Sequence, residues 1–377
     1  MKSKTQVKYG CVIILLGLLL SSSPNYMHLS QAQQSALVIE NPTSYFVLAA
    51  IFNMQPQRAK PSLLTTIADL HQPLWEFERI QRTLRGGSTA NVKLYLLDAW
   101  PRLNAGQRRE LLHKMATLGA YDVLSTLSER YNLPPVFSTL VAIWQGKPVK
   151  TFSNNPYLQP FQLVEQAQAG DSACRFKLAL IGSDLADLTH LQALKSAFEA
   201  HPEPAEKVYC LSQPIYVADK LDCTTNQGFA MCDLALNSAF AGYDYLVLMA
   251  GDGLANVSDK QMTLTHASTY NTFVHELMHF SGFEDEYPIP VNKAKWLCAT
   301  SGKKAPNLYV GEQAPNNWVL SRTCEHGKLP SYKPNKAHSL LEYQSIKLDE
   351  NYRKRWLSVL KSGSVADKAI VNSAEQF

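Results

Sequence analysis

Two different spacings of apolar residues divide the chain. Between residues 43 and 150, apolar side chains recur every three or four positions, as in the stripe from Leu111 to Leu118, which is typical of amphipathic helices. Glycine and proline residues interrupt this pattern repeatedly, so we expect several short helices and not one long one. The sequence therefore predicts an all-α helical module over residues 33–150.

The pattern changes after a segment rich in Asn, Pro, Gln and Gly at residues 151–173, which we expect to be a linker. The short apolar runs Phe176–Ile181 and Tyr243–Ala250 are typical of buried strands. Between them, Asp184 can cap a helix whose apolar face extends to Phe198. The predicted fold class is therefore α+β, with the helical module followed by an α/β domain over residues 174–377.

The amino-terminal segment has the composition of a secretory signal peptide. Three lysines precede the apolar run Cys11–Leu20, and serines follow it. This run is about half the length that a membrane-spanning helix needs, roughly 20 residues, although an uncleaved anchor remains the alternative. We expect a signal peptide over residues 1–32, with cleavage after Ala32 or nearer Ser23. The mature protein is then exported, periplasmic or extracellular, without stable membrane insertion.

Cysteine usage agrees with export. Six cysteines lie outside the signal segment, all of them after residue 173, and an even number in an exported chain predicts disulfides. Buried free thiols are the alternative. Spacing favours the pairs Cys223–Cys232 and Cys298–Cys324, which leaves Cys174 with Cys210.

Composition narrows the class of protein. The chain is 46% hydrophobic and 18% charged, which is typical of a globular protein and excludes a disordered chain or a coiled coil. Its net charge of +4 includes the three lysines of the signal segment. We therefore expect no nucleic-acid partner.

The candidate chemistry lies in the segment Asn271–Tyr287, NTFVHELMHFSGFEDEY. His275 and His279 are four residues apart, so on a helix both rings project from one face and can reach one metal ion. Imidazole suits Zn²⁺, and a catalytic zinc takes three protein ligands and leaves a position for water. Glu276 is placed to act as the general base. The alternative is an ordinary amphipathic helix with two surface histidines.

A third ligand is expected after Gly282, which allows the chain to turn back toward the helix. Asp285 follows three residues later, and the neighbouring Glu284 and Glu286 also offer oxygen atoms.

The motif resembles the zinc signature of the metzincin peptidases, HExxHxxGxxH, with Asp285 in the place of the third histidine. HELMHFSGFEDE is similar to the astacin form, and the aspartate is similar to the snapalysin-type variant. This resemblance implies that His275, His279 and Asp285 bind Zn²⁺, with Glu286 as the alternative to Asp285. The sequence Asp-Glu-Tyr at 285–287 is also similar to IgA-peptidase-type bacterial metallopeptidases.

Metzincins also carry a methionine turn beneath the metal, but this chain has no methionine after Met278. The segment Ser339–Tyr343, SLLEY, resembles the astacin turn SxMxY with Leu341 in the place of methionine. The resemblance implies that Tyr343 stabilises the oxyanion, and a core tyrosine is the alternative. It also implies an edge strand before the active-site helix, at residues 253–258 or 262–266, that binds the substrate backbone.

These observations predict an exported zinc-dependent endopeptidase that acts on peptide or protein substrates. The resemblance implies a metzincin-like zincin domain with a twisted sheet and an active-site helix, in which Glu276 and Tyr343 are catalytic. The helical module would be a scaffold, a substrate-recruiting module or an inhibitory pro-segment. Two alternatives remain open: a zinc-stabilised binding protein without catalytic activity, whose helical half recruits a protein partner, and a zinc amidase acting on cell-wall material.

Overall fold

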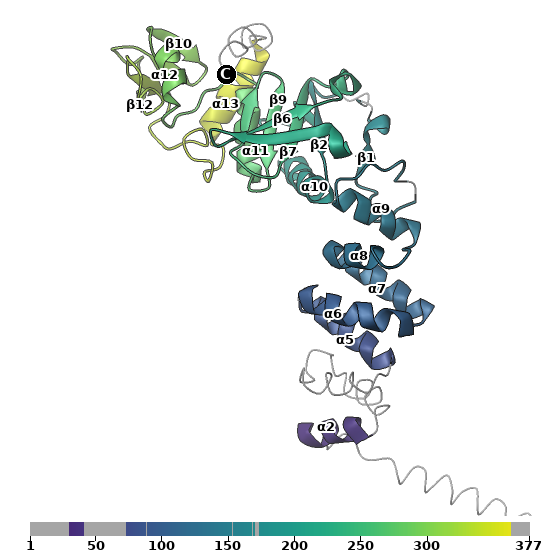
Figure 1. Ribbon diagram of the computed structural model, residues 1–377. Coiled ribbons are helices and arrows are strands. Elements are labelled where there is room, and N and C mark those ends of the chain that lie inside the picture. Colours follow the sequence, from purple (N-terminus) through teal and green to yellow (C-terminus); the bar gives the residue numbers. More distant parts are fainter. Residues whose placement is uncertain are drawn as a thin grey trace, which may run out of the picture. The chain divides into compact units, whose positions relative to one another are not determined.

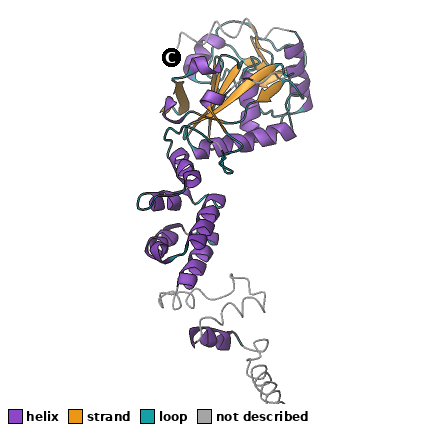
Figure 2. Cartoon of the chain, turned by 90° about the vertical axis from the view of Figure 1, so that its right-hand side faces the viewer, coloured by secondary structure: helices purple, strands orange, loops and turns teal. Residues whose placement is uncertain are grey.

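The computed structural model describes residues 30–40, 73–87, 89–152, 154–167, 169 and 173–362. The predicted signal peptide lies outside these residues except for its last three positions. Contacts divide the chain into two compact units, Met1–Leu133 and Pro134–Phe377. Figure 2 shows helices in the first unit and strands enclosed by helices and loops in the second. Within the described ranges, no helix is long and apolar enough to cross a membrane.

The described part of the first unit consists of helices. They are α2 (Gln31–Glu40), α5 (Pro73–Arg85), α6 (Thr89–Ala99), α7 (Ala105–Thr117) and α8 (Tyr121–Ser128). Asn104 is the N-cap of α7 and forms a capping box with Gln107. The Asn104 side chain accepts a hydrogen bond from the backbone N–H of Gln107, and the Gln107 side chain accepts one from the backbone N–H of Asn104. The stripe predicted in α7 is buried except for Leu118, which is 50% exposed. That part of the prediction is wrong because α7 ends at Thr117 and the chain turns away.

The second unit begins with α9 (Pro135–Trp144), ahead of the boundary expected at residue 150. Its central sheet has the strand order β1-β4-β2-β7-β9-β8, with β3 also paired to β2. The strands are β1 (Gln162–Leu163), β2 (Phe176–Gly182), β3 (Tyr209–Leu211), β4 (Ile215–Tyr216), β7 (Tyr245–Ala250), β8 (Asn256–Ser258) and β9 (Gln261–Thr265). All pairings are parallel except that of β8, the antiparallel edge strand. The segment expected to be a linker thus contributes β1.

The two faces of this sheet are covered by different elements, because successive side chains of a strand point to opposite faces. Leu178 and Leu180 of β2 pack in one core with α10 (Leu185–Ala200), α11 (Tyr270–His279) and α13 (Glu350–Lys361). Figure 1 shows α10, α11 and α13 against the sheet. Ala179 and Ile181 face a second core, to which the hairpin of β5 (Leu221–Asn226) and β6 (Phe229–Leu234) contributes.

A smaller antiparallel sheet lies between α11 and α13 in the sequence. It consists of β10 (Gly302–Ala305), β11 (Leu308–Val310), β12 (Val319–Ser321) and β13 (Ser331–Lys333), in the order β10-β11-β13-β12. With α12 (Val291–Leu297) it shares a small apolar core. We call residues 289–333 the disulfide lobe. Short 3₁₀ helices occur at Trp100–Arg102, Val164–Gln166, Ala218–Lys220 and Asn237–Phe240.

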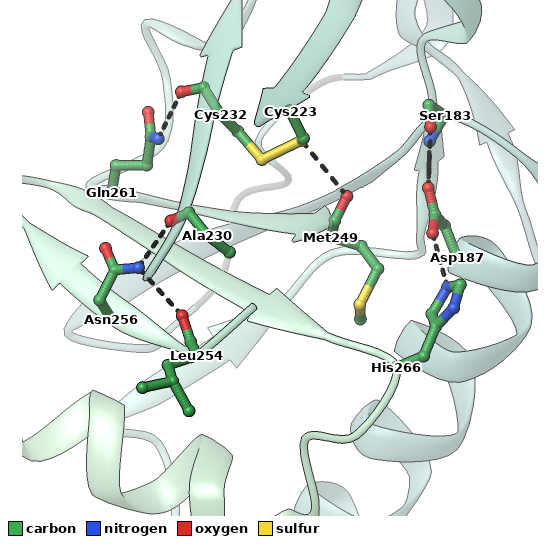
Figure 3. The surroundings of a disulfide bond; sticks show 10 residues. All are labelled: Ser183, Asp187, Cys223, Ala230, Cys232, Met249, Leu254, Asn256, Gln261 and His266. Atoms are coloured by element: carbon green, nitrogen blue, oxygen red, sulfur yellow. Dashed lines mark hydrogen bonds and ion pairs between the residues drawn. A yellow bond between two sulfur atoms is a disulfide. The ribbon is translucent and has the colours of Figure 1, made fainter. Parts of the chain in front are cut away.

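Three disulfides are present in the second unit: the two pairs favoured by spacing and the pair that these leave. They are Cys174–Cys210, Cys223–Cys232 and Cys298–Cys324, with Cα–Cα distances of 5.7, 4.1 and 5.8 Å. Cys223 and Cys232 are directly opposite each other on β5 and β6 (Figure 3). The prediction of disulfides and of a mixed α+β fold is confirmed.

Candidate metal centre

Helix α11 carries the HExxH motif and is fixed at both ends. Thr269 caps its start, since its side chain accepts from the Thr272 amide. After its last residue, His279, the chain turns through Gly282 at a φ of 75°, a conformation that favours glycine. The Phe283 amide then donates to the Met278 carbonyl. This turn directs residues 284–287 back toward the helix.

Three donor atoms converge at one point beside α11. The Nε2 atoms of His275 and His279 are 3.1 Å apart. The Oδ1 atom of Asp285 is 3.1 Å from the first and 3.3 Å from the second. Tetrahedral donors about 2.0–2.1 Å from a zinc ion lie about 3.3–3.4 Å from one another. The triangle therefore has the size that one zinc ion needs.

The hydrogen bonds of the two rings decide which nitrogen atoms face this triangle. His275 Nδ1 is 3.0 Å from the Leu340 carbonyl oxygen, and His279 Nδ1 is 2.9 Å from that of Phe283. A carbonyl oxygen only accepts, so each Nδ1 carries the proton and a neutral ring presents the Nε2 lone pair. Asp285 Oδ1 is buried, and its nearest polar neighbours are these two Nε2 atoms, at 3.1 and 3.3 Å. With both rings neutral, three acceptor atoms would meet, an arrangement that a metal ion or a proton stabilises.

The electrostatics of the triangle also favour a positive charge at its centre. Burial opposes the charge on Asp285, but the two histidines hold its pKa far below the usual value. Burial likewise opposes the charge on His279, but Asp285 outweighs it and raises the pKa of His279 to about 9. Without a metal, the cluster retains a proton, and a metal ion must displace it.

Glu276 lies beside the triangle, farther from the His279 nitrogen atom than Asp285 is. Its side chain is buried, and Oε2 is 4.0 Å from His279 Nε2. The donor atoms of His275, Glu276 and His279 all lie within 4.8 Å of one another. Asp285 is closer to His279 Nε2 than Glu276 is, so Asp285 is the better candidate for the third ligand. Glu276 lies where a base could reach a water molecule on the metal. Burial raises the pKa of Glu276.

Glu286, the alternative third ligand, is engaged elsewhere. It is fully buried, and its Oε1 atom accepts hydrogen bonds from Asn307 and Tyr352. Its Oε2 atom accepts from Ser339 at 2.6 Å and is 3.5 Å from Lys333 Nζ. Both oxygen atoms are therefore directed into a polar cluster of the fold and not toward the histidines.

The loop that carries Asp285 is fixed by the disulfide lobe. Asn307 accepts from the Glu284 amide at 2.9 Å and donates to the Glu284 carbonyl at 2.7 Å. The Thr323 hydroxyl donates to the Asp285 carbonyl at 2.7 Å. On the other side, the Glu286 amide donates to the Leu341 carbonyl at 2.9 Å. The backbone on both sides of Asp285 is thus held in place before any metal binds.

The turn Ser339–Tyr343 contacts the centre through its backbone. Leu340 accepts from His275, and the Leu341 side chain is fully buried. Tyr343, in contrast, is 44% exposed, and its ring lies 5.0 Å from that of His338. Among the described residues, no hydrogen bond or ring contact joins Tyr343 to the three candidate ligands. The structure therefore brings the turn to the centre, but not the Tyr343 side chain.

The aromatic residue at the centre is Tyr287. Its ring is nearly parallel to that of His275, with a centroid distance of 6.4 Å and an interplanar angle of 12°. Burial, followed by the charges of Asp285 and Glu276, raises the pKa of Tyr287 strongly. The similarity of the segment Asp-Glu-Tyr at 285–287 was a signal for this residue in the sequence, but that similarity implied no role for Tyr287.

Two other histidines of the second unit have partners of their own. His266 Nε2 is 2.8 Å from Asp187 Oδ1, whose other oxygen accepts from Ser183 (Figure 3). His338 Nδ1 is 2.9 Å from Glu342 Oε2.

Strand β8 is close to α11, as an edge strand that binds substrate would be. The strand at 261–265 is instead internal, between β7 and β8. Leu254, just before β8, pairs with the backbone of Gly228 and Ala230 at the start of β6. Asn256 Nδ2 donates to the carbonyls of Ala230 and Leu254 (Figure 3). The hairpin thus covers the start of this edge.

No known protein family matches the chain, and no curated protein or solved structure is significantly similar to it. The metzincin and IgA-peptidase-type resemblances therefore depend on the short motifs at 275–287 and 339–343. What this centre can do is decided by the chemistry of its donor atoms. Two neutral imidazoles, one carboxylate oxygen and a nearby carboxylate are suited to a hydrolytic zinc site.

Proposed function

We propose that the chain is a zinc-dependent endopeptidase. The observation that carries this proposal is the triangle of His275 Nε2, His279 Nε2 and Asp285 Oδ1, with sides of 3.1–3.3 Å. Imidazole nitrogen with carboxylate oxygen is a donor set that zinc accepts readily, and a set of three leaves a fourth position open. The further carboxylate of Glu276 supports catalysis, since a purely structural site does not need it.

When bound, a zinc ion supplies a Lewis acid that polarises the substrate carbonyl and acidifies a water molecule. Glu276 would accept the proton of that water and deliver it to the departing amine. Burial favours its neutral form and raises its pKa, and a base with a pKa nearer to neutrality exchanges protons more readily at neutral pH. Substrate backbone would add to the part of β8 that the hairpin leaves uncovered, a mode suited to peptides of varied sequence.

We also propose that residues 174–362 form a metzincin-like zincin domain. Three features support this relationship: the parallel sheet with an antiparallel edge strand, the helix α11 with its HExxH motif, and the turn at 339–343 that accepts a hydrogen bond from His275. The three disulfides support export, because disulfides persist in oxidising compartments. The proposed location is therefore periplasmic or extracellular.

The Glu276→Gln variant tests the proposed function. Zinc-loaded full-length protein is incubated with reduced, alkylated casein, and peptide release is compared between the parent and the variant. We expect E276Q to retain zinc and thermal stability but to lose at least about 100-fold in rate, the range for a general base. The control is Glu312→Gln, an exposed glutamate in the same unit, which should keep the parental rate. Parental activity in E276Q, or none in the parent, contradicts the proposal.

The same preparations separate the alternative functions. Release of soluble fragments from peptidoglycan, but not from casein, would indicate the cell-wall amidase. Zinc binding without either activity would favour the binding protein, for which the first unit offers a location. An open groove of about 900 Å³ lies there beside α6 and the end of α8, lined by Lys93, Leu94, Leu97, Arg102 and Arg130 among others.

A further inference from the structure

We propose that helix α13 positions the metal centre through Trp356 and Tyr352, which hold the two ends of the segment that carries His279 and Asp285. We call residues 279–286 the ligand segment. The inference rests on the proposed zinc site. It concerns the affinity of that site for metal and the geometry of the bound ion, however, so it can be tested apart from catalysis. Trp356 and Tyr352 act through neighbours of the ligands and are therefore positioning residues.

Trp356 and Tyr352 lie on the buried face of α13. They are four residues apart, so both side chains project from one side of the helix, and both are fully buried. The helix packs in the same apolar core as α11 (Figure 1). A buried indole N–H or phenol O–H usually finds a hydrogen-bond partner, and both groups have theirs in the ligand segment. One face of α13 thus provides packing and two directed hydrogen bonds.

Trp356 holds the end of the ligand segment next to His279. Its Nε1 atom donates to Ser281 Oγ at 2.7 Å, and the Tyr209 hydroxyl is 3.2 Å from the same oxygen atom. The Trp356 ring also lies 6.5 Å from the ring of Phe283, at an interplanar angle of 62°. The carbonyl of Phe283 is the partner of His279 Nδ1, at 2.9 Å. Trp356 therefore supports the residue that orients the His279 ring.

Tyr352 holds the other end of the ligand segment, next to Asp285. Its hydroxyl donates to Oε1 of Glu286, which also accepts from Asn307. Glu286 is fully buried, and its amide donates to the Leu341 carbonyl at 2.9 Å. Because Glu286 directly follows Asp285, a fixed Glu286 restricts the Asp285 backbone and with it the direction of the Asp285 carboxylate.

Helix α13 is itself fixed by contacts outside the ligand segment. Arg353 donates to both carboxylate oxygen atoms of Glu203, which lies between α10 and β3, at 2.8 and 2.6 Å. Near the end of the helix, the Leu360 carbonyl accepts from Arg175, which directly precedes β2. These contacts do not involve the candidate ligands, so α13 can serve as a fixed support for them. Groups that orient metal ligands from outside commonly contribute 10- to 100-fold to metal affinity.

The variants Trp356→Phe and Tyr352→Phe each remove one donor and keep an aromatic ring. Zn²⁺ affinity of the full-length protein is measured by competition with a chromophoric chelator, and the absorption spectrum of the Co²⁺-loaded protein is recorded. Each variant should bind Zn²⁺ about 10- to 100-fold more weakly and shift the Co²⁺ spectrum. The matched control is Tyr216→Phe, which removes a buried hydroxyl that donates to the Lys147 carbonyl at 2.8 Å. It should retain the parental affinity and spectrum.

Ser281→Ala tests the Trp356 contact from the side of the ligand segment, and it replaces W356F if that variant does not fold. S281A should also bind Zn²⁺ more weakly than the parent. The double variant W356F/S281A should bind about as weakly as the weaker single variant, because both substitutions break the same hydrogen bond and their effects are then not additive. Fully additive losses of binding free energy would show that the two residues act independently, which contradicts the inference.

Parental Zn²⁺ affinity with an unchanged Co²⁺ spectrum in either W356F or Y352F overturns the inference, because both ends of the ligand segment must be held. Equal weakening in Y216F also overturns it, since the effect would then not be specific to α13. Lower thermal stability of the metal-free variants, with parental affinity and spectrum, assigns α13 to packing alone and has the same consequence. If the parent hydrolyses no substrate but W356F and Y352F bind zinc more weakly than it does, the proposed function fails and this inference stands.

Discussion

His275 Nδ1 lies 3.0 Å from the carbonyl oxygen of Leu340, a residue 65 positions farther along the chain. This hydrogen bond ties α11 to the turn at 339–343 and fixes the tautomer of the first candidate ligand. The leucine that follows, Leu341, has no exposed surface. Under the proposed metzincin-like relationship, Leu341 would take the place that methionine has in the metzincin turn.

The turn should accept methionine at Leu341 with little loss. Leucine and methionine have similar volumes, so Leu341→Met should change the free energy of unfolding by less than about 1.5 kcal/mol and leave zinc affinity intact. Leu341→Ala should cost about 2–5 kcal/mol because it leaves a cavity. Urea unfolding of the two variants checks this. A loss in L341M as large as that in L341A would show that the turn is not an equivalent of the methionine turn.

Asp285 and Glu286 should respond differently to loss of their charge. Asp285→Asn should lower zinc affinity by more than about 100-fold, beyond the effect typical of an outer partner. Glu286→Gln should instead lower the free energy of unfolding by about 1.5–3 kcal/mol, because the hydrogen bonds that Ser339 and Tyr352 donate to its buried carboxylate lose their charged acceptor. Lys333 keeps Glu342 as its partner. Bound zinc and urea unfolding are measured for both. Loss of zinc in a well-folded E286Q would make Glu286 the ligand.

Two of the disulfides should differ in their effect on zinc binding. Thr323, next to Cys324, donates to the Asp285 carbonyl, so the Cys298→Ser/Cys324→Ser variant should bind zinc more weakly. It should also lose about 3–4 kcal/mol of stability, as expected for a crosslink that closes a loop of this size. The matched variant Cys223→Ser/Cys232→Ser alters only the β5–β6 hairpin and should bind zinc as the parent does. Equal zinc affinity in the two variants would contradict the link between lobe and ligand.

Glu342 should contribute stability that acid removes. Burial opposes its charge, but hydrogen bonds from Lys333 and His338 outweigh this and hold the pKa of Glu342 below its usual 4.5. A lowered pKa in the folded state stabilises the fold above the unfolded pKa, and this contribution is lost as the pH falls through the folded pKa. The difference in unfolding free energy between the parent and Glu342→Gln should therefore shrink below about pH 4.5. A difference that does not depend on pH would contradict the prediction.

The sequence predicted the parts of the fold that local patterns specify. Strand β2, strand β7 and helix α10 follow from their apolar periodicity. Two disulfide pairs follow from spacing, and Cys174–Cys210 follows as the remaining pair. Strand β1 was not predicted because two residues are too few to show a period, and it forms only by pairing with β4. Leu118 was placed in a core because spacing alone does not show where α7 ends.

For the candidate site, the sequence specified the spacing of the histidines but left the third ligand open. Asp285 and Glu286 are chemically alike, and their different directions depend on partners that lie far along the chain, such as Asn307 and Tyr352. The role expected of Tyr343 remains a prediction, although its side chain is 44% exposed. The ring of Tyr287 lies beside that of His275, and only the tertiary structure reveals this.

The anchoring of residues 284–286 by Asn307 and Thr323 bears on when, after synthesis of the chain, the candidate metal centre forms. The third corner of the triangle is held by a lobe that is itself closed by the Cys298–Cys324 crosslink. Under the proposed function, a newly synthesised chain in a reducing cytoplasm would lack this support. Its hydrolytic capacity would develop only after oxidation in the destination compartment, which would protect the producing cell while the chain is in transit.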